Sequence, residues 1–292
     1  MTTTTTSFTE AVLAEMIEER VEDIHIPKGV FLSVADVKGV PGGSGGTVRL
    51  LRQDSISAPA AGTKTEDAEF GLVEHLLSEA TASVGTVGYS ARPSYELIAD
   101  ASIDVLSTII NSGMRLLANR VDVDGLALLS SLVPIASFAG LATTDQRMIS
   151  ALATYHAANP NDDGSMIAFV GNHIQFRDWT SDLAALGAGY LGGDAESNTV
   201  AAMIGPGRGF KGVKHGMACF MSTNVPVSGG DASGGIFPMG DGSPLALRSW
   251  RGATIEIEKI PRRQAVEITI SNRYGVTVSD TSNGVEVLSD GA

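Results

Sequence analysis

The chain has 292 residues, more than one compact core usually spans, so we expect one large domain or two to three closely joined ones. Hydrophobic residues make up 43% and charged residues 18% of the chain, a composition too apolar for a disordered protein. The net charge of −13 disfavours a protein that grips nucleic acid, because phosphate binding needs clustered Lys and Arg. An acidic balance is also common among ordinary cytoplasmic proteins, so by itself it discriminates little between functions.

Three features bear on the compartment. The single cysteine, Cys219, excludes an intrachain disulfide framework. Residues 1–7 have neither the basic nor the apolar region of a secretory signal. The longest apolar stretch, 126–142, is shorter than the ~20 residues that a bilayer requires, and Pro134 interrupts it. We therefore expect no membrane association and a buried position for this stretch.

The N-terminal region has the pattern of an amphipathic helix. Ser7 and Glu10 have capping-box spacing. Apolar residues follow at helical spacing with acidic residues opposite: Val12, Leu13, Met16, Ile17, Val21 and Ile24. Pro27, Pro41 and the glycine-rich run at 42–46 come next, so we expect an arm joined flexibly to the rest.

Residues 47–90 are typical of a long β-hairpin. Two β-like stretches, 47–51 and 80–89, enclose a polar middle. A two-stranded hairpin with so little apolar content is marginal in water by itself, so we expect it to lie on a neighbouring copy. The candidate contacts between copies are four residues of its middle: Lys64, Glu66, Asp67 and Phe70.

The strongest helical pattern covers 95–120. Pro93 and Ser94 open it, and Glu96 in the first turn suits the positive end of the helix dipole. At ~1.5 Å per residue the helix spans roughly 39 Å, long enough to be the backbone of an extended, flattened subunit.

Beyond Leu126 the pattern alternates between helix and strand, and the last part alternates with period two as half-buried antiparallel strands do. The predicted elements are a helix at 144–158, a strand at 166–170, a helix at 173–186, and strands at 217–222, 255–258, 266–270 and 276–278. The predicted fold class is α+β.

Three stretches carry a resemblance to a known family. Residues 88–100 (GYSARPSYELIAD) resemble its strand leading into a long "spine" helix, and 119–122 resemble the end of that helix. Residues 212–226 (GVKHGMACFMSTNVP) resemble a return strand, and 266–279, with Tyr274-Gly275-Val276, resemble the closing strands. With the order of elements over nearly the whole chain, these stretches resemble the major capsid proteins of tailed bacteriophages with the Hong Kong 97 (HK97-like) fold.

The resemblance implies an organisation into five segments. They are an N-terminal arm and linker (1–46), an extended loop or E-loop (47–90), a peripheral domain with the spine helix (91–125), an axial α/β domain (126–245), and closing strands of the peripheral domain with a C-terminal tail (246–292). Some family members begin with a long scaffolding segment, and none precedes Ser7, so the resemblance implies a separate scaffolding protein or its removal by processing.

The resemblance also implies a function. The protein is expected to be structural, not an enzyme, without cofactors, and to form the hexamers and pentamers of an icosahedral head around double-stranded DNA that it encloses without specific binding. The implied partners are copies of itself, a portal, scaffolding and decoration proteins, and the implied locations are the virion capsid and the host cytoplasm during assembly. In a minority of the family a loop lysine forms an isopeptide bond to an asparagine of the next subunit, and Lys64 is the lysine of this loop.

Four motifs suggest chemistry, and each has a simpler interpretation. The glycine-rich run 205–209 lacks the Lys-Ser or Lys-Thr of a phosphate loop, and Pro206 removes an N–H donor. His215 and Cys219 are two potential ligands or a nucleophile pair, but a β-like context and the lack of further ligands favour an ordinary strand.

The other two motifs are acidic. Asp122 and Asp124 resemble the start of a calcium loop, but Leu126 stands where an oxygen ligand is needed, which favours a helix C-terminal turn. Asp100 and Asp104 are interpreted as solvated charges on an exposed helix face.

Two alternatives to a phage capsid remain open. An encapsulin-like nanocompartment shell shares the fold class and encloses cargo protein. A soluble enzyme using the α/β block is the alternative from another class, and it lacks a set of converging ionisable residues.

Overall fold

The computed structural model describes residues 29–40, 46–53, 77–100, 105–159, 165–185 and 209–291. The helices of this part are α2 (Val30–Val34), α3 (Tyr95–Asp100), α4 (Val105–Leu126), α5 (Asp145–Ala158) and α6 (His173–Ala185), with 3-10 turns η2 (Ala127–Ser131), η3 (Gly240–Gly242) and η4 (Pro261–Arg263). The strands are β1 (Asp36–Gly39), β2 (Thr47–Gln53), β3 (Leu77–Ser83), β4 (Gly85–Ala91), β5 (Ile135–Phe138), β6 (Ile167–Gly171), β7 (Gly209–Lys214), β8 (Met217–Met221), β9 (Val227–Ser228), β10 (Asp231–Pro238), β11 (Leu245–Ile260), β12 (Ala265–Val278) and β13 (Val285–Asp290).

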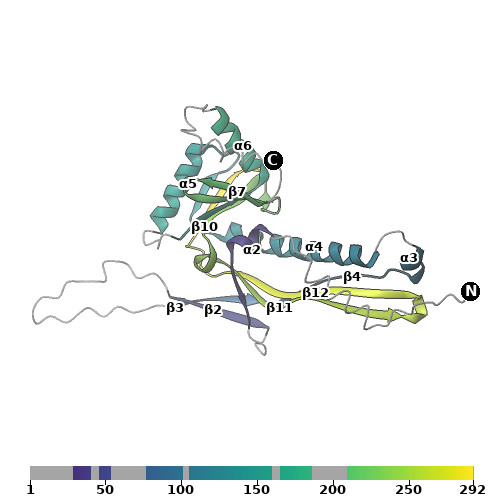
Figure 1. Cartoon of the computed structure of the whole chain (residues 1–292). Coiled ribbons are helices and arrows are strands. Elements are labelled where there is room, and N and C mark those ends of the chain that lie inside the picture. The colour runs from purple at the N-terminus through teal and green to yellow at the C-terminus, as the bar shows by residue number, and fades with distance from the viewer. Residues whose placement is uncertain are drawn as a thin grey trace, which may run out of the picture.

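The elements form an elongated lower layer and a compact upper part (Figure 1). The lower layer is a four-stranded sheet in the order β1-β11-β12-β4, with α4 lying along it. The upper part is a seven-stranded sheet in the order β5-β13-β10-β6-β8-β7, with β9 paired to β10, and it carries α5 and α6. A third sheet, the two-stranded β2–β3 ribbon, leaves the molecule at the end opposite α3. The fold class is α+β, as predicted.

The lower layer is held by an apolar contact between α4 and the sheet. Ile110, Met114 and Leu117 of α4 are buried against β12, where Ile268 and Ile270 face the helix. Gly113 has the small size this contact needs, because a Cβ there would lie 2.6 Å from Ile270 and 2.8 Å from Tyr89. The period-two pattern predicted the strands correctly, and it continues into one long hairpin of β11 and β12.

The long helix differs from its predicted bounds. The sequence predicts one helix at 95–120, whereas the structure has α3 and then α4, which ends at Leu126, and residues 101–104 lie outside the described part. The end is later because Val121 and Leu126 continue the buried stripe into the core between the two sheets, where they meet Val170 and Phe220.

The upper sheet is packed on its helices through large aromatic side chains. Trp179 and Phe176 of α6 meet Phe169 of β6, with ring centroids 5.4 to 6.1 Å apart. Met148 and Tyr155 of α5 complete this core with Val285 and Val287 of β13. The predicted helices and strands at 144–158, 166–170, 173–186 and 217–222 are confirmed to within one residue.

Two predicted placements are wrong, because strand pairing and burial depend on residues far apart in the sequence. A strand that was not predicted, β13 at 285–290, lies in the upper sheet between β5 and β10. The stretch 80–89 is divided between β3, which pairs with β2, and β4, which pairs with β12. The apolar stretch 126–142 is only partly buried, because it contains the edge strand β5, where Ile135 is 52% exposed.

Candidate assembly surfaces

The β2–β3 ribbon is the base of the predicted extended loop. Arg49 and Glu79 form an ion pair across it at 3.2 Å, and Leu51 is 68% exposed. The ribbon is held at its root, where Ala82 is fully buried and the carbonyl of Ser83 approaches Gly275 of β12 too closely for any side chain there. A two-stranded ribbon anchored at one end is marginally stable by itself, so it is a candidate surface for contact with a second protein. The candidate contacts Lys64, Glu66, Asp67 and Phe70 lie outside the described residues.

The Tyr-Gly pair singled out in the sequence has two structural roles. Gly275 has no side chain, which leaves room for the Ser83 carbonyl of the ribbon. The hydroxyl of Tyr274 donates a hydrogen bond to Asp124 of α4 at 2.8 Å. Burial, and then the hydrogen bond to Asp124, raises the pKa of Tyr274. The pair therefore joins β12 to both the ribbon and the long helix.

The first described helix, α2, is anchored to α4 by a hydrogen bond to Asp122. Oδ1 of Asp122 accepts a hydrogen bond from the backbone N–H of Phe31 at 2.8 Å. Its Oδ2 accepts from the hydroxyl of Ser222 at 3.1 Å and from the side-chain amide of Asn224 at 2.9 Å. Asp122 was interpreted as part of a helix C-terminal turn, and it lies in the last turns of α4, but as a buried acceptor for protein donors.

A groove of about 1000 Å³ lies beside this junction. Its lining is mixed polar and apolar and comes from α4, the start of α2, the start of β7 and the turn after β8: Gly29, Val30, Ser112, Arg115, Leu116, Ala118, Asn119, Asp122, Gly209, Ser222, Thr223 and Asn224. The predicted arm helix, at 7–24, lies outside the described residues.

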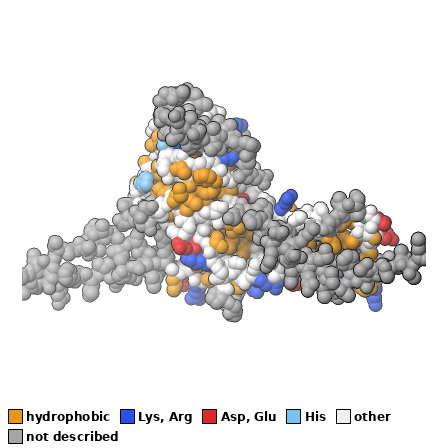
Figure 2. Space-filling view, viewed as in Figure 1, with side chains coloured by type: hydrophobic (Ala, Val, Ile, Leu, Met, Phe, Trp, Pro, Cys, Tyr) orange, Lys and Arg blue, Asp and Glu red, His pale blue; other side chains and the backbone are white. Residues whose placement is uncertain are grey.

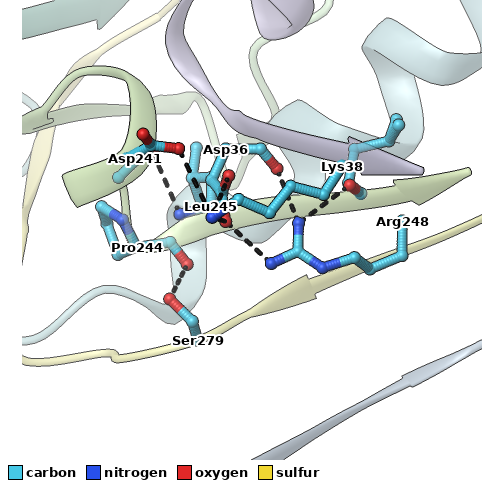
Figure 3. A network of polar contacts seen from close by, with 9 residues as sticks. Asp36, Lys38, Asp241, Pro244, Leu245, Arg248 and Ser279 are labelled. Carbon is cyan, nitrogen blue, oxygen red and sulfur yellow. Dashed lines mark hydrogen bonds and ion pairs between the residues drawn. The ribbon is translucent and has the colours of Figure 1, made fainter. Parts of the chain in front are cut away.

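A buried ion pair attaches β1 to the lower sheet. The guanidinium of Arg248 donates to Oδ2 of Asp36 at 2.7 Å and to the Asp36 carbonyl at 3.0 Å, and both side chains are buried (Figure 3). Lys38 lies on the solvent side, with Nζ 3.2 Å from Oδ1 of Asp36 and 3.4 Å from Asp241. The hydrogen bond to Asp36 raises the pKa of Lys38. β1 runs parallel to β11, so this network fixes the first described strand in its register.

The described residues of the motifs that suggested chemistry lie in turns, in a buried strand and at helix ends. His215 and Gly216 form the turn between β7 and β8, and Nε2 of His215 lies 2.7 Å from Oδ1 of the buried Asp145. Cys219 is buried in β8, and burial raises the pKa of its thiol to about 12, so it is no nucleophile at neutral pH. Asp100 lies at the end of α3, while Asp104 and residues 205–208 are outside the described part.

Among the described residues, no three or more His, Cys, Asp or Glu side chains come together in a way that could hold a metal ion. Within the same part of the chain, no helix has both the length and the apolar character needed to cross a bilayer.

Comparison with known proteins gives a match in structure but not in sequence. No family model matches the chain, and no curated protein matches it significantly. The capsid of cyanophage P-SCSP1u matches with a TM-score of 0.64 at 12% identity, over 90% of this chain and 89% of that chain. The head of Helicobacter pylori bacteriophage KHP40 matches with a TM-score of 0.65 at 10% identity, over 90% of both chains.

The chain thus has the fold of shell-forming proteins. Within that class it has the HK97-like fold of phage capsid proteins, as the sequence resemblance predicted. The encapsulin SrpI of Synechococcus elongatus PCC 7942 shares this fold, with a TM-score of 0.60 at 11% identity over 88% of this chain and 85% of that chain.

Proposed function

We propose that the protein is the major capsid subunit of a tailed bacteriophage, a structural protein whose copies form the hexamers and pentamers of an icosahedral head around double-stranded DNA. The observation that carries this proposal is the shared fold over about nine tenths of the chain with proteins described as phage capsids and heads. The exposed β2–β3 ribbon supports it, because such a ribbon gains stability by lying on a neighbour.

The five segments are proposed with two revisions that follow from strand pairing. The arm is 1–46, and its last part is held by Asp122 and Arg248. The extended loop of 47–90 loses β4, which belongs to the four-stranded sheet of the proposed peripheral domain. The axial domain of 126–245 gains β13 from the segment 246–292.

The proposed contents, partners and location of the shell follow from the charge of the chain and from the resemblance. A net charge of −13 disfavours adhesion to packaged DNA, so the enclosed genome is held without specific binding. A portal, a separate scaffolding protein and decoration proteins are the proposed partners besides further copies. The subunit is proposed to reside in the virion, and in the host cytoplasm while heads assemble.

Electron microscopy of the expressed protein tests the proposal. Closed shells are expected from the full chain. Replacing 54–76 by a short Gly-Ser turn keeps β2, β3 and β4, so the subunit is expected to stay folded while shells no longer close. Replacing Lys64, Glu66, Asp67 and Phe70 by serine keeps the loop length and isolates the candidate contacts. Normal shells from the shortened chain contradict the proposed role of the loop.

A cross-link through Lys64 is tested separately. Denaturing electrophoresis of mature particles is expected to show a ladder above the 30.2 kDa monomer if an isopeptide bond joins subunits. Only a monomer band excludes the bond and leaves the capsid proposal intact.

An encapsulin-like compartment is the second candidate, supported by the structural match to SrpI. Particle content distinguishes the two functions. Nucleic acid in particles from infected cells, and portal, terminase and protease genes nearby, favour the phage head. An enclosed enzyme encoded by a neighbouring gene favours the compartment.

A further inference from the structure

The two outer strands of the seven-stranded sheet expose apolar side chains. β7 is one edge, and its Phe210 and Val213 are 58% and 42% exposed. β5 is the other edge, where Ile135 is 52% exposed, and Val133, in the bend that leads into β5, is 54% exposed. Edge strands of soluble proteins usually turn charged side chains outward, and these two do not. Apolar side chains gather on the upper part of the molecule, which holds this sheet (Figure 2).

Both apolar edges lie on the same face of the sheet. Phe210 and Val213 are the register partners of Phe220 and Ala218, which belong to the core between the two sheets. Cross-strand partners point to the same face. Ile135 precedes Ala136, which belongs to the core on the opposite, helix-covered face, so Ile135 points to the same face as Phe210. Leu129 and Leu132 lie against the middle of this face, whereas Phe210, Val213 and Ile135 at its two edges are partly exposed.

The two edges cannot simply pair as strands. The lysines of β7, Lys211 and Lys214, are buried, with only 4% and 6% of their surface exposed, so the exposed side chains of this strand are the apolar Phe210 and Val213. A bulge interrupts β7 between Phe210 and Gly212, and Gly212 has a φ of 115°. The bulge breaks the regular ladder that an added strand needs, so contact through side chains is favoured.

We propose that the β7 edge of one copy docks on the β5 edge of the next copy, with Phe210 and Val213 against Val133 and Ile135. Two different patches at opposite edges of one sheet make a head-to-tail contact, and a head-to-tail contact that repeats by rotation closes into a ring. This inference rests on the proposed function, because it identifies the contact that joins subunits within one hexamer or pentamer.

A charge exchange across the contact tests the proposal. F210K and I135E each place one charge in an apolar contact, and in F210K/I135E opposite charges face each other at every contact between copies. Sedimentation velocity over a concentration series gives the concentration at which half of the subunits are in rings. Each single variant is expected to raise that concentration at least tenfold, and the double variant is expected to return within threefold of the wild type. L97E, on the exposed face of α3, is the control and is expected to assemble normally.

The outcomes separate this contact from the proposed function. Thermal unfolding of the dissociated subunits is expected to be the same for all variants, because each substituted side chain is at least half exposed. Single variants that assemble like the wild type overturn the proposal. A double variant that needs as high a concentration for ring formation as the single variants also overturns the proposal. Such a result would mean that β7 does not face β5 across the contact. A wild-type chain that stays monomeric at every concentration overturns both this contact and the proposed function.

Discussion

The carboxylate of Asp122, inside α4, accepts a hydrogen bond from the backbone N–H of Phe31, 91 residues earlier in the chain. Asp122→Ala leaves this buried N–H without its acceptor and removes the partner of Ser222 and Asn224. We expect the free energy of unfolding to fall by about 2 to 3 kcal/mol, as for buried groups left unpaired. Urea denaturation of dissociated subunits measures it. Glu256→Ala, at an exposed carboxylate, is the control, and equal losses in both variants contradict the prediction.

Gly125 and Phe31 lie in such close contact that a methyl group on Gly125 would overlap the ring. Gly125→Ala is expected to destabilise the protein by about 1 to 3 kcal/mol through overpacking, despite the better helix propensity of alanine. Adding Phe31→Leu makes room and is expected to recover part of the loss. Thermal unfolding compares these variants with Gly252→Ala, where a Cβ meets nothing within 4 Å. No recovery in the double variant means that the ring is not the cause.

Removing one partner of the Asp36–Arg248 pair leaves a buried charge uncompensated. Asp36→Ala is expected to cost about 3 to 5 kcal/mol, whereas the apolar pair D36L/R248M is expected to be close to the wild type. A double-mutant cycle in urea measures the coupling. A double variant as unstable as Asp36→Ala would show that the strand needs the charges themselves.

Burial raises the pKa of Glu286 above its ordinary value of 4.5, and the hydrogen bond with Ser233 opposes the shift only in part. The folded state therefore holds the proton more tightly than the unfolded state does. This contribution to stability is full below about pH 4.5 and is lost as the pH rises through the folded pKa. Glu286→Gln is expected to raise the melting temperature at pH 7 and to change it little at pH 4. A gain of the same size at both pH values contradicts this assignment.

The thiol of Cys219 is expected to be inert in the native protein, because burial holds its pKa at about 12. A thiol reagent at pH 8 should label less than a tenth of the folded chains and all chains in guanidinium. Complete labelling of the native subunit within minutes would show that β8 opens readily.

Local sequence patterns predicted the helices and strands well, but they predicted poorly which strands pair with each other. α5, β6, α6 and β8 follow from periodicity and turn residues within a few positions of each other. β13 alternates as β12 does, and nothing within its six residues shows that its partners are β5 and β10.

The same limit applies to the candidate surfaces. Asp36 and Arg248 are 212 positions apart, and no local signal connects them. An apolar residue such as Phe210 looks the same in sequence whether it is buried or exposed, so the sheet edges became visible only in the structure. The four loop residues proposed from sequence are still predictions.

The position of β13 also sets an order of events during synthesis. It lies between β5 and β10, so β5 has no partner in the upper sheet until residues 285–290 have been synthesised. The lower layer, in contrast, has all its strands by Val278. A chain still being translated therefore lacks the finished β5 edge, whereas the β7 edge needs only β8 for its pairing.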